Sequence, residues 1–258
     1  MSSPSVRPIR TEVFSRWYSG VFGLLVLTTL VVLALEFVWT DGPTAAFLAV
    51  VSLAVLAESA LVWSLVDRAS SGSHTPQFTL ATWVTVSRGA AVAVLAGFLV
   101  SPTVTGHAVW IPVVLFVAAA ALDAVDGAIA RATGTATDLG ARLDTEMDGL
   151  VVFVGSVLAV SAGSAPIILL LAGSARYLFV AGTWWRTRRG SSVNDLPPNR
   201  FRRPLGALLM LAIWLALVPT PGSTTSSVIV MIVVIPFLAN FYWDWRAVTG
   251  RRTSIAGQ

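Results

Sequence analysis

Long apolar runs separated by short polar segments dominate this chain. A helix needs about 20 mostly apolar residues to cross a bilayer core about 30 Å thick, and eight stretches approach that length. None shows the alternation of a membrane β-barrel strand, and a backbone in lipid must satisfy its own polar groups. The pattern therefore predicts an all-α, polytopic integral membrane protein with spans at about 20–39, 44–66, 78–100, 107–130, 143–163, 165–185, 204–220 and 225–245.

The composition supports a lipid environment. Apolar residues make up 55% of the 258 positions and charged residues only 12%, with a mean hydropathy of +0.78. Soluble domains carry about 25% charged residues, so much of this surface must face something other than water. The sequence contains no cysteine, which excludes disulfides, thiolate metal sites and cysteine nucleophiles.

Arginine placement predicts the orientation. All 17 basic residues are arginines, and those outside the spans lie before the first span or after the second, fourth, sixth and eighth. By the positive-inside rule both termini are cytoplasmic. Because these arginines lie in short loops rather than along one polar face, we expect contact with anionic membrane lipid and no nucleic-acid partner. The absence of lysine suggests a GC-rich genome, and hence a prokaryotic cell membrane.

Two polar segments divide the chain. Residues 67–77 separate the first two spans from the other six, and residues 186–203 form the most basic loop. We therefore predict a region of two extra spans with a tail and a linker over 1–77, a six-helix core over 78–246, and a basic cytoplasmic tail over 247–258.

Acidic residues gather in one part of this core. Six of the 13 acids lie between positions 123 and 148. Asp123 and Asp126 share one face of a helix by i, i+3 spacing, and Asp144 and Asp148 share one by i, i+4 spacing. A short connection returns the second helix antiparallel to the first, so the four carboxylates can converge. They would repel each other unless divalent cations neutralise them.

The ligand chemistry favours magnesium. Carboxylate oxygens without His or Cys select Mg²⁺, or Mn²⁺ or Ca²⁺ in its place. Magnesium held by few protein carboxylates completes its shell with water and substrate phosphates, so a diphosphate-bearing substrate is the natural partner. Gly127 leaves room for a ligand against the helix, and Arg131 lies on the same face, where a guanidinium can bind phosphate.

These residues resemble a known family. Asp123, Asp126, Gly127, Ala130, Arg131, Gly140, Asp144 and Asp148 follow the pattern D-x2-D-G-x2-A-R-x8-G-x3-D-x3-D of the CDP-alcohol phosphatidyltransferases. The resemblance extends over the six spans from about 78 to 245 and omits 1–77. It implies a membrane enzyme of phospholipid biosynthesis that transfers a phosphatidyl-type group from a CDP-linked lipid to an alcohol hydroxyl and releases CMP.

The resemblance also implies roles for individual residues. Asp123, Asp126, Asp144 and Asp148 are expected to hold two Mg²⁺ ions, with Mn²⁺ as an alternative, and Asp148 to act as the general base. Gly127, Arg131, Thr137 and Gly140 are expected at the CDP-lipid. In the third span, FTLATWVTVSRGA resembles the family's N-x-x-T-x-x-R segment and adds Thr82, Thr85 and Arg88 to that set, with Thr82 in place of Asn. A homodimer is also implied.

The acceptor is less defined. Arg200 and Arg203 resemble two arginines that bind the acceptor phosphate in the family's inositol-phosphate branch, whereas the segment GSARYLFVAG lacks that branch's Lys. This departure argues against inositol phosphate and leaves glycerol phosphate, another polyol phosphate or a small alcohol such as serine open. Electrostatic anchoring to the membrane explains the basic loop equally well.

The rival interpretation is a membrane transporter or channel whose buried acids and arginines line a cation path. Glu36 and Glu58 lie within the first two spans, where an ionisable group indicates function or pairing. We favour pairing with Arg88 or Arg176, or a position near the membrane interface, over an ion or proton path.

Overall fold

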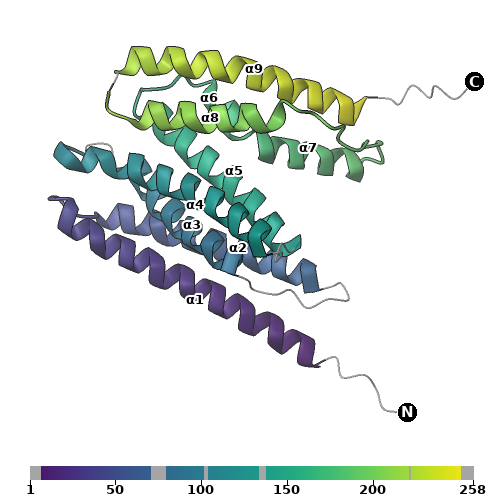
Figure 1. The fold of residues 1–258 in the computed structure, drawn as a ribbon, viewed down its shortest axis with the longest axis horizontal. Helices are drawn as coiled ribbons and strands as arrows, with labels where there is room; N and C mark the ends of the chain where they lie inside the picture. Colours follow the sequence, from purple (N-terminus) through teal and green to yellow (C-terminus); the bar gives the residue numbers. More distant parts are fainter. Residues whose placement is uncertain (1–6, 71–79, 102–103, 134–137, 221, 251–258) are drawn as a thin grey trace, which may run out of the picture. The chain divides into compact units, whose positions relative to one another are not determined.

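The computed structural model describes residues 7–70, 80–101, 104–133, 138–220 and 222–250, and within these it leaves out the side chains of 7–13, 16, 68–70, 80–82, 123–133 and 138. Every regular element in the described part is helical, which confirms the all-α prediction (Figure 1). In chain order the elements are α1 (Arg7–Val38), α2 (Ala45–Ser70), α3 (Leu80–Gly97), η1 (Phe98–Val100), η2 (Gly106–Trp110), α4 (Ile111–Thr133), α5 (Asp138–Ser161), α6 (Leu169–Gly173), α7 (Ala175–Arg188), α8 (Arg202–Leu217) and α9 (Ser223–Thr249).

The protein is a multi-pass membrane protein. Four helical stretches in the described part are long and apolar enough to cross a bilayer, namely Trp17–Val38, Ala45–Asp67, Trp83–Val100 and Ser223–Thr249. The other predicted spans also fall on helices, but α4 and α5 include the motif acids and α8 is short. The sixth predicted span is divided between α6 and α7 at Ser174, whose hydroxyl donates to the carbonyl of Leu170 at 2.6 Å. The count of eight spans therefore stays a prediction.

The chain forms two compact units, divided after Val154 within α5. In the first unit α3 is the inner helix, since it contacts α1, α2 and α4 (Figure 1) and most of its span is buried. Its Val86, Ala90 and Ala93 pack with Leu24 of α1 and Val55 of α2. Small side chains along α3 let the neighbouring backbones approach closely, as is usual where membrane helices associate.

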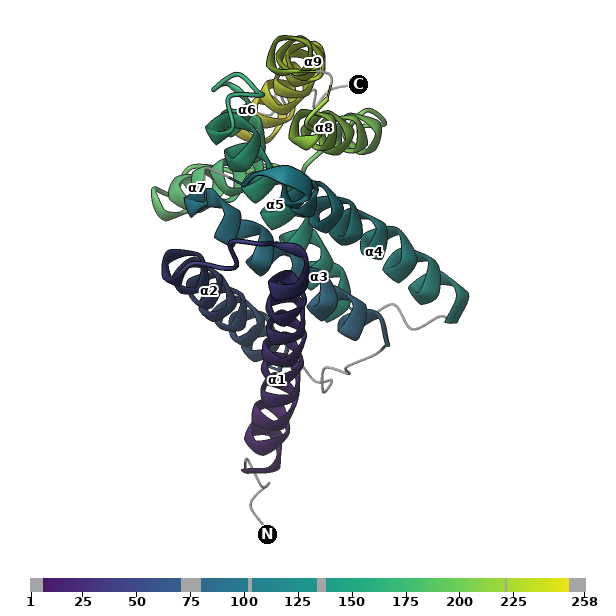
Figure 2. The same cartoon turned by 90° about the vertical axis from the view of Figure 1, so that its left-hand side faces the viewer.

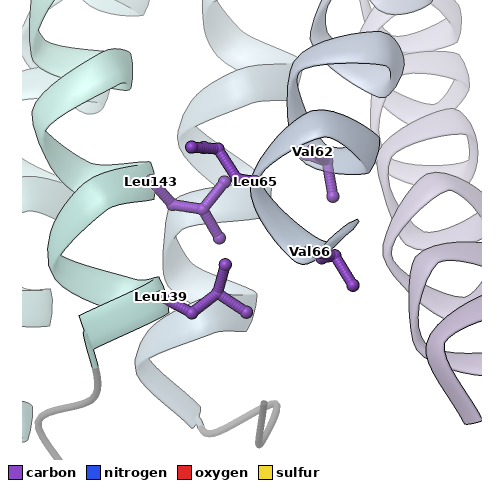
Figure 3. Packing of buried hydrophobic residues seen from close by; sticks show 5 residues of the cluster. All are labelled: Val62, Leu65, Val66, Leu139 and Leu143. Carbon is purple, nitrogen blue, oxygen red and sulfur yellow. The ribbon is translucent and has the colours of Figure 1, made fainter. Parts of the chain in front are cut away.

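The two N-terminal helices also pack against α5. Figure 3 shows Val62, Leu65 and Val66 of α2 beside Leu139 and Leu143 at the start of α5, and all five are buried. The indole of Trp17 donates to the carbonyl of Ser59 at 3.0 Å and so joins α1 to α2. The helices outside the predicted core thus support the helix that holds Asp144 and Asp148.

In the second unit α8 and α9 lie side by side in both views (Figures 1 and 2), and α6 contacts α9. The turn between α8 and α9 includes Gly222, whose φ of 99° lies in the region that favours glycine. Gly182 of α7 packs against the ring of Trp245, because a Cβ there would lie 2.4 Å from that ring. The segment between α7 and α8 is the basic loop.

Candidate active site

One buried arginine binds two of the motif aspartates. The Arg88 side chain has no exposed surface, and its Nη1 and Nη2 donate to Oδ1 of Asp144 and Oδ1 of Asp148, respectively. Its Nε donates to the carbonyl of Ala119 in α4 at 3.1 Å. A single guanidinium on α3 therefore holds two carboxylates one turn apart on α5 and is fixed against α4.

The buried guanidinium is paired, and its two carboxylate partners are partly exposed. A guanidinium in a membrane interior is stable only with partners, and Asp144 and Asp148 provide them. Both aspartate side chains keep 37% of their surface exposed, and an ionised carboxylate can accept about four hydrogen bonds. Both carboxylates therefore keep exposed surface at which a ligand could meet their oxygen atoms.

Helix geometry explains the arrangement. Asp144 and Asp148 are four residues apart, so their side chains lie on the same face of α5. Thr85, which is also buried, lies one turn before Arg88 on α3. Next to Arg88, Gly89 makes room for a neighbour from α2, because a Cβ at this position would lie 2.7 Å from Oε2 of Glu58. A larger residue at 89 would therefore displace the carboxylate end of the Glu58 side chain.

Most of the other predicted site residues lie where the structure does not describe side chains. Asp123, Asp126, Gly127 and Arg131 belong to α4 and Thr82 to α3, but their side chains are outside the described set, and Thr137 is outside the described residues altogether. Gly140 lies near the start of α5, half-buried. The convergence of all four aspartates thus stays a prediction.

The described donors fit a hard divalent cation. Only oxygen ligands are available at Asp144 and Asp148, as Mg²⁺ or Mn²⁺ prefers. Among the described side chains, no three acids or histidines come together as a metal site. Asp144 and Asp148 are thus chemically suited to part of a magnesium shell, and Asp123 and Asp126 are the predicted remainder.

The predicted acceptor arginines lie in the second unit. Arg200 and Arg203 are exposed at the start of α8. Between them, Arg202 donates from Nε to Oδ2 of Asp244 at 2.7 Å and from Nη2 to Oδ1 at 3.0 Å. This hydrogen bonding raises the pKa of the Arg202 guanidinium.

Asn199 and Asn240 complete a polar cluster around Asp244, which we call the Asp244 cluster: Asn199, Arg202, Asn240 and Asp244. Sequence reasoning missed it, although one signal was available. Asn240 and Asp244 are spaced i, i+4 in an otherwise apolar helix, and an acid within a membrane helix is expected to have a polar partner.

Within the described residues, Glu58 is buried without the arginine partner that was predicted for it. It is 3% exposed, and its Oε2 has no hydrogen-bond partner in the described part of the chain. Pairing with Arg88, one of the alternatives predicted for Glu58, is not found in the described part of the chain, because the guanidinium of Arg88 binds the two aspartates instead. Glu58 lines a pocket with Thr85 and Leu143. Glu36, in contrast, is exposed.

Comparison with known proteins gives one match. Residues 78–239 match the family model described as CDP-alcohol phosphatidyltransferase. The match covers α3 and most of the chain beyond it, and it leaves out α1 and α2. No curated protein and no solved structure matches the chain.

Proposed function

The chain belongs to the CDP-alcohol phosphatidyltransferases, membrane transferases of phospholipid-type headgroups, and from this premise we propose its specific reaction. It transfers a phosphatidyl-type group from a CDP-linked lipid to the hydroxyl of an alcohol acceptor and releases CMP. Glycerol phosphate or another polyol phosphate is the proposed acceptor. The observation that carries the proposal is the pair of motif carboxylates, Asp144 and Asp148, held at a partly exposed position by the buried Arg88.

The proposed reaction is a single displacement at phosphorus. The acceptor oxygen forms a bond to the lipid-side phosphorus of the diphosphate, and the bond from that phosphorus to the bridging oxygen breaks. The bridging oxygen leaves with its electron pair as part of CMP. The acceptor proton passes to Asp148, which acts as general base.

We assign Arg88 a positioning role at the aspartates rather than a direct contact with the CDP-lipid. Its buried guanidinium fixes one oxygen of each carboxylate and so limits their rotation. Preorganised groups reduce the cost of assembling the reacting geometry. Thr82, Thr85, Gly127, Arg131, Thr137 and Gly140 remain the proposed contacts to the CDP-lipid.

Two Mg²⁺ ions, or Mn²⁺ in their place, are proposed at Asp123, Asp126, Asp144 and Asp148. When bound, they would neutralise the diphosphate and stabilise the departing CMP. The support is the oxygen-only donor set and the partial exposure of Asp144 and Asp148. Arg200 and Arg203 are proposed to bind the acceptor phosphate. The support for this role comes from the second unit alone, in which both side chains are exposed.

We further propose a homodimer in a prokaryotic cell membrane, with both termini and the active site at the cytoplasmic face. The arginine distribution supports the orientation, since basic residues favour the cytoplasmic side. The homodimer rests on the family resemblance, and the prokaryotic membrane on the use of arginine without lysine. The motif residues lie at the end of α4 and the start of α5, next to a connection that this orientation makes cytoplasmic.

An acceptor panel tests the proposed reaction. Purified full-length protein would be supplied with Mg²⁺ and CDP-diacylglycerol or a CDP-dialkylglycerol, and CMP release would be measured with glycerol 3-phosphate, inositol phosphate, glycerol, inositol and serine. We expect release that depends on the acceptor and is fastest with glycerol 3-phosphate. No release with any acceptor would contradict the proposed function, and preference for an unphosphorylated alcohol would contradict the proposed acceptor class.

A further inference from the structure

The Asp244 cluster saturates one buried carboxylate with hydrogen bonds. Asp244 is 7% exposed. Its two oxygens accept from Arg202 Nε at 2.7 Å, Arg202 Nη2 at 3.0 Å, Asn199 Nδ2 at 3.2 Å and Asn240 Nδ2 at 3.3 Å. Charge-assisted, two-pronged contacts between arginine and carboxylate fix geometry as well as charge. The cluster thus joins the start of α8 to α9.

The same contacts order the backbone that leads into α8. Asn199 also donates to Oδ1 of Asn240 at 2.7 Å, and its own Oδ1 accepts from the amide of Phe201 at 2.9 Å. Arg202 Nη2 donates in addition to the carbonyl of Pro197 at 2.6 Å. The segment from 197 to 202 is therefore held by side chains on both sides of Arg200.

Bound and exposed residues alternate along this segment. Asn199 and Arg202 bind α9, whereas Arg200 and Arg203 are exposed and have no hydrogen bond or ion pair to any described residue. Arg203 belongs to the first turn of α8, whose unpaired backbone amides favour an anion. Two unpaired guanidinium groups beside a helix N-terminus are suited to a phosphate group.

The ordered backbone over residues 197–202 distinguishes a phosphate-binding site from a simple membrane anchor. A basic loop attracts an anionic surface through its net charge, whatever its conformation. Fixing side chains costs conformational entropy, which simple anchoring does not require. A phosphate site, in contrast, gains from guanidinium groups whose backbone is already in place.

We propose that Asp244 is a positioning residue for acceptor specificity: through Arg202 and Asn199 it holds the start of α8 so that Arg200 and Arg203 bind the phosphate of the acceptor. The inference rests on the proposed function. It predicts a selective loss, because the cluster acts on acceptor binding and leaves the CDP-lipid site and the chemical step unchanged.

The test is a comparison of kinetic constants in full-length protein. Asp244→Asn keeps the shape of the side chain but removes the charge that Arg202 binds. We expect the KM for glycerol 3-phosphate to rise about tenfold, with the KM for CDP-diacylglycerol and kcat within about twofold of wild type. Turnover with unphosphorylated glycerol should be unchanged.

Asn194→Ala is the matched control. Asn194 also binds the end of α9, from Nδ2 to the carbonyl of Gly250 at 2.7 Å, but lies outside the Asp244 cluster. We expect its acceptor KM to equal that of wild type. Should Asp244→Asn not fold, Asn199→Ala takes its place with the same expected rise.

The outcomes separate the inference from the proposed function. A wild-type protein that releases no CMP, or that uses only unphosphorylated alcohols, contradicts the proposed function and with it the inference. A wild-type protein that uses glycerol 3-phosphate, together with an unchanged acceptor KM in the variant, overturns the inference alone. An equal rise in both KM values with a fall in kcat also overturns it, because that pattern indicates a general structural role.

Discussion

The guanidinium of Arg88 on α3 donates to Oδ1 of Asp148 on α5, across 60 positions of sequence. The two residues come from different parts of the matched family region and meet where α1 and α2 also pack. Asp148 is therefore held in one orientation, as a general base requires.

Asp148→Asn removes the proposed base without changing the size of the side chain. General base catalysis contributes about 10²- to 10⁴-fold, so we expect CMP release to fall by at least about 100-fold. The amide oxygen can still accept from Arg88, so elution on gel filtration and the circular dichroism spectrum should stay as in wild type. A folded variant with full activity would remove Asp148 from its role.

Arg88→Gln leaves Asp144 and Asp148 without their shared partner. Breaking a buried ion pair by removing one member costs about 3–5 kcal/mol in soluble proteins, and we expect a lower melting temperature in detergent as well as slower turnover. Arg176→Gln is the comparison, because Arg176 is half-buried and lies in the second unit. Equal melting temperatures for wild type and Arg88→Gln would contradict the positioning role.

Metal removal should stop the reaction. We expect EDTA to abolish CMP release, and Mg²⁺ or Mn²⁺ to restore it, because oxygen ligands favour these ions. Asp144→Asn should raise the Mg²⁺ concentration needed for half-maximal activity about tenfold or more. Activity that persists in EDTA after exhaustive dialysis would rule out a required divalent ion.

The packing of α2 on α5 predicts a stability effect. Leu143 is buried against Leu65 and Val66 (Figure 3), so Leu143→Ala should leave a cavity and cost on the order of 2 kcal/mol. Leu53→Ala is the control on the same pair of helices, since Leu53 is 67% exposed. Thermal unfolding in detergent should show a lower midpoint for Leu143→Ala alone, and equal midpoints would mean that α2 does not support α5.

Glu58→Gln distinguishes a transferase from a transporter. Glu58 lies outside the matched family region and has an Oε2 without a partner in the described part of the chain. A transferase should keep its rate of CMP release, whereas a cation path through Glu58 should lose ion flux in proteoliposomes. Loss of flux in Glu58→Gln with unchanged CMP release would reveal a second activity.

Much of the fold can be predicted from the sequence because lipid restricts the possible structures. Apolar length and helical periodicity predict where the helices lie, since a backbone in lipid must satisfy its own polar groups. Hydropathy does not predict where a helix ends: α5 begins at Asp138, five residues before the predicted span, because polar residues extend a helix beyond its apolar part. The break at Ser174 was missed because the run 165–185 is apolar throughout most of its length, and hydropathy does not report a local interruption of the helix.

The site could be predicted in part. The spacing of Asp144 and Asp148 places them on one helical face, and the cost of a buried arginine indicated that Arg88 has partners. Which acids it binds depends on how α3 packs against α5, and no local pattern contains that information. The Asp244 cluster was missed for the same reason, because Asn199 and Asp244 are 45 residues apart.

The most direct test of the central claim is the stoichiometry of the reaction. Wild-type protein with Mg²⁺, CDP-diacylglycerol and labelled glycerol 3-phosphate should form one labelled lipid for each CMP released, and neither product should appear when the acceptor is omitted. CMP release without a labelled lipid product, or no CMP at all from folded protein saturated with both substrates, would contradict the account.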